Sequence, residues 1–133
     1  MRASAHNARE RDIPILSGSD TGNASAFSHG KWHGKEAELF VREVGMTPME
    51  AIVANTSANA AMVNLAGEVG VIAAGKLADL VIWDSDPLAD ITVLQRPAEI
   101  FLIIKDGRIV DREAGGFRQL IGEPPRARTV LTG

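Results

Sequence analysis

The apolar residues of this chain change from mainly helical to strand-like spacing near Gly70, and this change limits the folds that the chain can adopt. Before Gly70 they recur three and four positions apart, as on one face of a helix. After it they form short runs rich in β-branched and aromatic residues, which is typical of strands. A length of 133 residues allows about one domain with a modest core. We therefore expect an α/β protein in which helices precede most of the strands.

Three parts are expected along the chain. Residues 1–66 should hold one short strand, at 13–16, and the helices that follow it. Residues 67–112 should hold β-strands, and residues 113–133, with paired glycines and prolines, should form a weakly ordered tail.

The helices have clear boundary signals. A helix over 36–44 would bury Ala37, Phe40, Val41 and Val44. The loop before this helix would hold His29 and His33. Gly45 should close this helix. The run Thr47-Pro48-Met49-Glu50 predicts a new helix with a capping box.

The second helix should turn Met49, Ile52 and Val53 inward. A further helix start is expected at Thr56 or Ser57, and the many alanines after it indicate close helix packing.

Four strand-like runs follow, at residues 71–72, 78–83, 100–104 and 108–110. The last two are separated by Lys105-Asp106-Gly107. An Asp-Gly pair between apolar runs predicts a tight hairpin, because both turn residues need positive φ.

Asp20 is the candidate for catalysis and for metal binding. It follows the apolar run 13–16, within the turn-forming cluster Ser17-Gly18-Ser19-Asp20-Thr21-Gly22. Catalytic groups of barrel enzymes stand where strands end, which favours a metal ligand here. The alternative is that Asp20 only caps a helix or orders the turn. A single carboxylate cannot hold a catalytic metal, and the sequence has no cysteine, no His-x-His pair and no HExxH helix to complete a site.

Composition argues against several classes of partner. The formal net charge of −3 argues against nucleic acid, because a phosphate-binding face needs clustered Lys and Arg. No apolar run reaches the roughly 20 residues of a membrane span. The first residues lack the apolar core of a signal peptide, and there are no cysteines for disulfides. A cytoplasmic protein with no nucleic-acid or membrane partner is therefore expected.

A series of motifs gives the chain a family resemblance. In order, these are Gly18-Ser19-Asp20-Thr21-Gly22, a His-Gly pair, Gly45-Met46-Thr47-Pro48-Met49-Glu50-Ala51-Ile52, Asn55-Thr56 with Asn59-Ala60-Ala61, and Gly75-Lys76-Leu77-Ala78-Asp79-Leu80-Val81. The series resembles the carboxyl-terminal part of the amidohydrolase superfamily, in particular its imidazolonepropionase-related and prolidase-like dipeptidase branch. The resemblance extends from about Ile13 to Asp111.

The resemblance implies the carboxyl-terminal part of a metal-dependent hydrolase with a (β/α)₈ barrel. Residues 1–66 would be the last barrel strand and the helices after it, and residues 67–112 would be strands of the small composite β-sandwich. Asp20 would match the family's metal-binding Asp, which also takes the proton from the attacking water. The family's other ligands, which are histidines and a Lys or Glu on other strands, have no counterpart in this chain.

The implied reaction is hydrolysis of a C–N bond in a small amide, cyclic amide or dipeptide. It would use water activated by a divalent metal, with Zn²⁺ as the first candidate. The chain alone is expected to be inactive. His33, His29 and Thr21 are expected on the substrate side of the site, and either histidine can be the counterpart of the family's His-Gly pair.

Two alternatives to a piece of one hydrolase remain open. The chain can be one half of a split hydrolase, or a non-catalytic interaction or scaffold module. In each case strands without their neighbours leave apolar surface and open edges. A homo-oligomer that covers these surfaces is therefore expected for the isolated chain.

Overall fold

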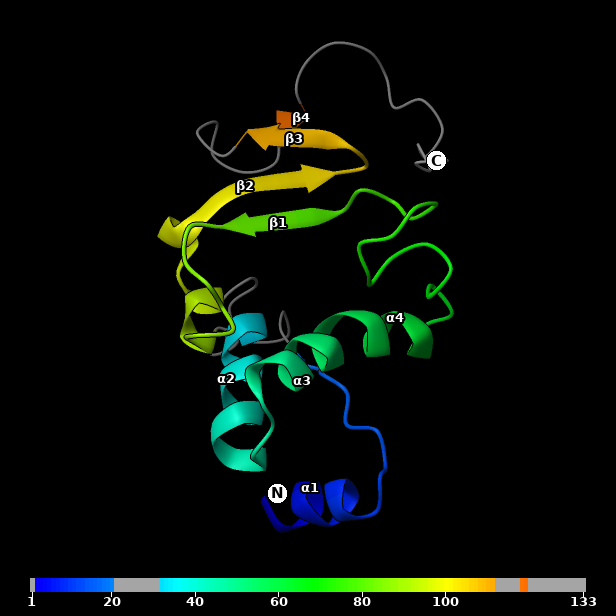
Figure 1. Ribbon diagram of the computed structural model, residues 1–133, viewed down its shortest axis with the longest axis vertical. Helices are drawn as coiled ribbons and strands as arrows, with labels where there is room; N and C mark the ends of the chain where they lie inside the picture. Colours follow the sequence, from blue (N-terminus) through cyan, green and yellow to red (C-terminus); the bar gives the residue numbers. More distant parts are fainter. Residues whose placement is uncertain (1, 21–31, 112–117, 120–133) are drawn as a thin grey trace.

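The computed structural model describes residues 2–20, 32–111 and 118–119. Figure 1 shows helices in the lower part of the molecule and an antiparallel sheet at the opposite end. The helical elements are α1 (Arg2–Glu10), α2 (Trp32–Val44), α3 (Pro48–Val53), the π-helical turn η1 (Ala54–Ala58) and α4 (Asn59–Met62). The sheet holds β1 (Leu80–Trp83), β2 (Ile100–Lys105), β3 (Arg108–Asp111) and β4 (Arg118–Gln119), and the 3₁₀ turns η2 (Ile91–Gln95) and η3 (Pro97–Glu99) join β1 to β2.

Helix α2 begins at Trp32, four residues before the predicted start. The expectation that His33 lies in the loop before this helix is therefore wrong. The reason lies in packing, because a Cβ at Gly34 would overlap the carbonyl group of Leu94 in η2. This close approach favours helix at a glycine that would otherwise weaken one. The predicted inner face of α2 is confirmed, with Ala37 and Val44 buried and Phe40 and Val41 packed beside the core.

The start of α3 has the predicted capping box. The Thr47 hydroxyl accepts a hydrogen bond from the Glu50 backbone N–H at 3.2 Å. In return, Glu50 Oε2 accepts one from the Thr47 backbone N–H at 2.7 Å. Gly45 ends α2 with φ of +77°, as a C-terminal glycine should.

The inward face of α3 differs from the prediction. Ala51 and Ala54 are buried, whereas Met49 and Val53 are exposed. Small residues at the contact let the helices approach closely, so the larger side chains lie outside it. The inward placement of Met49 and Val53 is therefore wrong. Of the alanines after Thr56, Ala60 is buried, whereas Ala61 is exposed.

No new helix starts at Thr56 or Ser57, because α3 runs through η1 directly into α4. The side chains of Asn55 and Thr56 donate hydrogen bonds to the carbonyls of Ala51 and Ile52, at 2.8 and 2.7 Å. These side chains bond to the preceding helical turn and do not cap the start of a new helix. The wider π-helical turn lies directly before Asn59.

The strands form one antiparallel sheet in the order β1-β2-β3-β4. Leu80 pairs with Ile104, and Ile104 pairs with Ile109. The predicted hairpin is confirmed, with φ of +51° at Asp106 and +72° at Gly107. Within the expected tail, the short strand β4 pairs with β3, and the rest of residues 113–133 lies outside the described residues.

Two predicted strands do not form. Residues 71–72 and 13–16 are neither helix nor strand, and Ile72 is 88% exposed. A strand needs a hydrogen-bonded neighbour, and the described residues offer none at either place.

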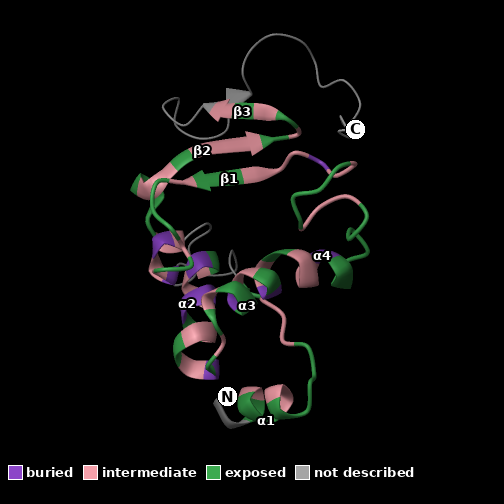
Figure 2. Cartoon of the chain, in the orientation of Figure 1, coloured by how far each residue is buried: buried purple, intermediate pink, exposed green. Residues whose placement is uncertain are grey.

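Buried residues gather where α2, α3 and η2 meet, as Figure 2 shows. Ala37, Ala51 and Ile91 form the centre of this core, with Leu94 packed against it. In contrast, no residue of β1 or β2 is buried, and Phe101 is 67% exposed. The sheet therefore has apolar faces that the described part of this chain does not cover.

Candidate functional site

Asp20 stands at the end of the segment that leads away from α1. Its backbone has φ of +48°, in the left-handed region. A residue other than glycine seldom adopts this conformation, and such residues concentrate in turns and functional sites. The side chain is exposed, so it can reach a ligand.

Two helices hold Ser17, three residues before Asp20. The Ser17 hydroxyl donates a hydrogen bond to Glu36 Oε2 of α2. Its backbone carbonyl accepts one from Asn59 Nδ2 of α4, at 3.1 Å. Glu36 is half-buried in this arrangement. The turn that carries Asp20 is therefore tied to both helices.

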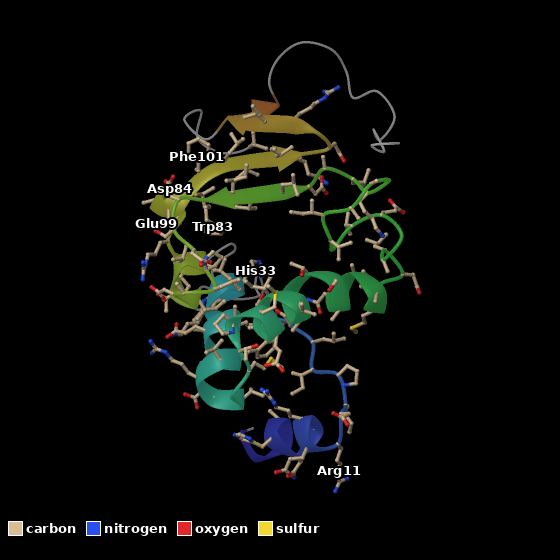
Figure 3. All side chains as sticks on the ribbon, viewed as in Figure 1. Arg11, His33, Trp83, Asp84, Glu99 and Phe101 are labelled. Atoms are coloured by element: carbon tan, nitrogen blue, oxygen red, sulfur yellow. The ribbon has the colours of Figure 1, made fainter. Side chains whose placement is uncertain are left out.

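A further contact lies beside Asp20. Ser19 Oγ is 3.1 Å from His33 Nδ1, which is hydrogen-bonding distance. His33 belongs to the first turn of α2 and is exposed, and Figure 3 shows it between the helices and the sheet. The predicted site residues Asp20 and His33 are therefore linked through Ser19. Thr21 and His29 lie outside the described residues.

The buried carboxylate of Glu38 fixes α2 against η2. It accepts hydrogen bonds from Lys35 Nζ at 2.6 Å and from Gln95 Nε2 at 2.7 Å, and it pairs with Arg42 at 2.8 Å. These partners lower the pKa of Glu38, with the Lys35 hydrogen bond as the largest cause. The helix that carries Glu36 and His33 is thus held by a charged network as well as by the apolar core.

The described residues do not form a complete metal site. Within them, no group of three His, Cys, Asp or Glu side chains could hold an ion. A catalytic zinc generally uses three protein ligands and one open position. Asp20 can supply one oxygen ligand, and the remaining ligands would have to come from elsewhere.

A pocket of about 530 Å³ has Ser17 in its lining. Its lining includes Asn55, Asn59, Leu65 and Leu77, but neither Asp20 nor His33. Most of its wall is apolar, so it offers few of the polar groups that orient an amide substrate. The Asp20 turn remains the better candidate site.

Sequence reasoning missed the roles of Ser17, Ser19 and Glu36. A serine or glutamate in a turn or on a helix surface usually faces solvent, so residue type alone gives no signal. Asn59 was part of a recognised motif, and its position among alanines is the one sequence signal for a polar contact with another segment.

The chain is similar to known proteins in sequence and in fold. Residues 1–110 match the Amidohydrolase family. Over 79 residues the chain is 42% identical to an imidazolonepropionase from Pyrobaculum arsenaticum, which covers 57% of this chain and 18% of that protein.

Two solved structures are also similar. A putative prolidase from Bifidobacterium longum has a TM-score of 0.72 and 31% identity, over 90% of this chain and 28% of that chain. A molinate hydrolase has a TM-score of 0.75 and 29% identity, over 97% of this chain and 30% of that chain. The chain thus spans less than a third of the length of each of these proteins. Within the described residues, no helix has the length and apolar character needed to cross a bilayer.

The family match covers most of the chain, from residue 1 to residue 110. This chain belongs to the amidohydrolase family.

Proposed function

We propose that this chain is the carboxyl-terminal part of a metal-dependent amidohydrolase that cleaves C–N bonds in small amides, cyclic amides or dipeptides. The observation that carries the proposal is the placement of Asp20, which is exposed in a left-handed turn that Ser17 ties to two helices. The family match and the similarity to an imidazolonepropionase and a prolidase support the reaction class.

Asp20 has two roles in this proposal. Its carboxylate oxygens offer one ligand to a divalent metal, with Zn²⁺ as the first candidate, although a carboxylate also suits other divalent ions. Such a metal, when bound, makes water nucleophilic at neutral pH and polarises a carbonyl. The free carboxylate oxygen of Asp20 can accept a proton from the attacking water and return it to the leaving amine.

The remaining parts of the site would come from polypeptide beyond the described residues. The exposed apolar sheet supports this, because a sheet of Leu, Val, Ile and Phe residues is normally covered on at least one face. The same observation favours a second candidate, in which a separate polypeptide supplies the other ligands and the two form a split hydrolase.

The test is hydrolysis of a panel of Xaa-Pro dipeptides, N-acyl amino acids and cyclic amides, with Zn²⁺, Mn²⁺ or Co²⁺ added. The 133-residue chain alone should show no turnover. If coding sequence upstream of Met1 extends the frame by roughly the 250 residues of a barrel, the extended protein should be active. If a neighbouring gene encodes that part, mixing the two proteins should restore activity.

Asp20→Asn is the control in the assembled enzyme. It keeps the size of the side chain but removes the charge, and it should reduce turnover by at least about 10²-fold, because it removes a metal ligand and the proton acceptor together. Metal-dependent turnover by the chain alone, abolished by Asp20→Asn, would contradict the need for other segments. Full activity of the Asp20→Asn enzyme would contradict the role of Asp20.

A further inference from the structure

The contact between Ser19 and His33 bears on the protonation of the imidazole ring. The two residues are 14 positions apart, and Ser19 Oγ lies 3.1 Å from Nδ1 of the ring. A neutral imidazole has one N–H donor and one acceptor nitrogen. The partner of one nitrogen determines which of the two carries the proton. A serine hydroxyl that donates to Nδ1 leaves the proton on Nε2.

We propose that Ser19 is a positioning residue that holds His33 in the tautomer with its proton on Nε2, so that the ring presents an N–H donor to an oxygen of the substrate. The inference rests on the proposed function, because amides supply the carbonyl or carboxylate oxygen that would accept this bond. It assigns a role to Ser19 and a specific atom of His33 to substrate recognition.

The backbone around His33 is held against η2. The next residue, Gly34, lies against the backbone of Leu94, so α2 cannot shift toward η2. Glu38, just over one turn further along α2, is buried and bonded to Gln95 of η2. Ser19 then fixes the ring through Nδ1, which leaves the Nε2 edge on the far side of the ring from Ser19.

The position of Ser19 in the chain brings His33 close to Asp20. Consecutive Cα atoms are about 3.8 Å apart, so the residue that holds the imidazole adjoins the residue that carries the carboxylate. His33 and Asp20 are both exposed, so an N–H donor on one and a carboxylate acceptor on the other can both reach a ligand. This pair fits a substrate that has an acceptor oxygen close to an N–H or amine group, as amides and dipeptides have.

The opposite direction of the hydrogen bond has a different chemical meaning. If His33 donates from Nδ1 to Ser19 Oγ, then Nε2 is an acceptor and the ring can act as a base. The tautomer of His33 therefore decides whether Nε2 of the ring is a hydrogen-bond donor or a base. It can be measured in the chain without any enzymatic activity.

The test uses the 133-residue chain labelled with ¹⁵N-histidine and long-range ¹H–¹⁵N spectra, recorded at a pH where the His33 signals show a neutral ring. Wild type should show His33 with the proton on Nε2. Ser19→Ala should give a mixture of tautomers, and Ser19→Thr, which keeps the hydroxyl, should restore the wild-type signal. Ser85→Ala is the matched control, because it removes a serine hydroxyl that bonds to Glu99, outside the Asp20 turn, and should leave the tautomer unchanged.

Titration with N-acetylglycine, an amide that carries a carboxylate, tests the recognition step. The Nε2 signal of His33 should shift in wild type and respond several-fold more weakly in Ser19→Ala. A wild-type ring protonated on Nδ1, or an identical tautomer in Ser19→Ala, would overturn the positioning role. A fixed Nε2–H tautomer without any response to the amide would overturn the recognition role. If the assembled wild-type enzyme hydrolyses none of the amides, that result counts against the proposed function. The tautomer result does not depend on it.

Discussion

The side-chain amide of Asn59 donates a hydrogen bond to the backbone carbonyl of Ser17 at 3.1 Å, across 42 positions of sequence. This bond joins α4 to the segment that ends at Asp20. A backbone carbonyl on an irregular segment needs such a partner when it is partly buried. The geometry of the candidate site thus depends on a helix that begins 39 residues after Asp20 in the chain.

Replacing Asn59 with alanine should loosen the turn that carries Asp20. We expect a loss of about 1 kcal/mol in the free energy of unfolding, because one half-buried hydrogen bond is removed. Amide NMR signals from Ser17 to Asp20 should shift. Asn55→Ala is the control, since Asn55 bonds to Ala51 within its own helix and should leave those signals in place. Equal effects of the two variants would contradict the role of Asn59 as a link between segments.

Adding a methyl group at Gly34 should weaken the contact between α2 and η2. The new Cβ would overlap the carbonyl group of Leu94, and we expect Gly34→Ala to lower the free energy of unfolding by about 1–3 kcal/mol. Gly67→Ala is the matched control, because nothing lies within 4 Å of the Cβ it would add. Urea unfolding of both variants provides the comparison, and a neutral result at position 34 would show that the two elements move apart easily.

Acid should destabilise the fold through three carboxylates. The pKa of Glu38 is lowered first by Lys35, that of Glu50 by the Thr47 backbone N–H, and that of Asp90 by the Thr92 hydroxyl. A lowered folded-state pKa means that the unfolded chain binds protons first as the pH falls. The stabilisation from the two glutamates is therefore complete above their ordinary pKa of 4.5, and that from Asp90 above 3.8. Each is lost as the pH falls from there through the lowered pKa of the folded state.

The measurement is the urea midpoint at a series of pH values between 7 and 3. The midpoint should fall most steeply below about pH 4.5. Glu38→Gln should be less stable than wild type at pH 7 and should show a shallower fall on acidification. An unchanged pH profile in this variant would argue that Glu38 does not contribute.

The isolated chain should self-associate through its sheet. Phe101 and Val81 expose 67% and 48% of their surface on strands that have no buried residue, and apolar surface of this kind favours association. We expect a dimer or larger species in sedimentation at high micromolar concentration. Phe101→Glu should shift the distribution toward monomer. Leu88→Glu, at an exposed apolar residue outside the sheet, should not. A compact wild-type monomer would refute the prediction.

Features that depend on neighbouring residues could be predicted from the sequence. The capping box at Thr47 and Glu50 and the hairpin at Asp106 and Gly107 involve residues one to three positions apart. Short-range hydrogen bonds and allowed backbone angles determine such features wherever the segment lies. The inner face of α2 also follows from its sequence, because helical spacing places Ala37 and Val44 on one side.

The candidate site was predicted only in part. Asp20 stood out because a turn-forming cluster follows an apolar run, and its role as a metal ligand remains a prediction. The start of α2 at Trp32, and with it the position of His33, depends on the contact between Gly34 and Leu94, 60 residues away. Local sequence disfavours a helix at glycine, so no local pattern could have given this result.

The sequence by itself determined the family, the main helices and the hairpin, because these rest on residue order and short-range interactions. Only the tertiary structure decided that Asn59 and Glu36 hold Ser17, that Ser19 meets His33, and that residues 13–16 do not form a strand. Each of these depends on which distant segments come together, or on whether a neighbouring strand is present. Partners of this kind are chosen by packing in three dimensions, which the spacing of residues along one segment does not specify.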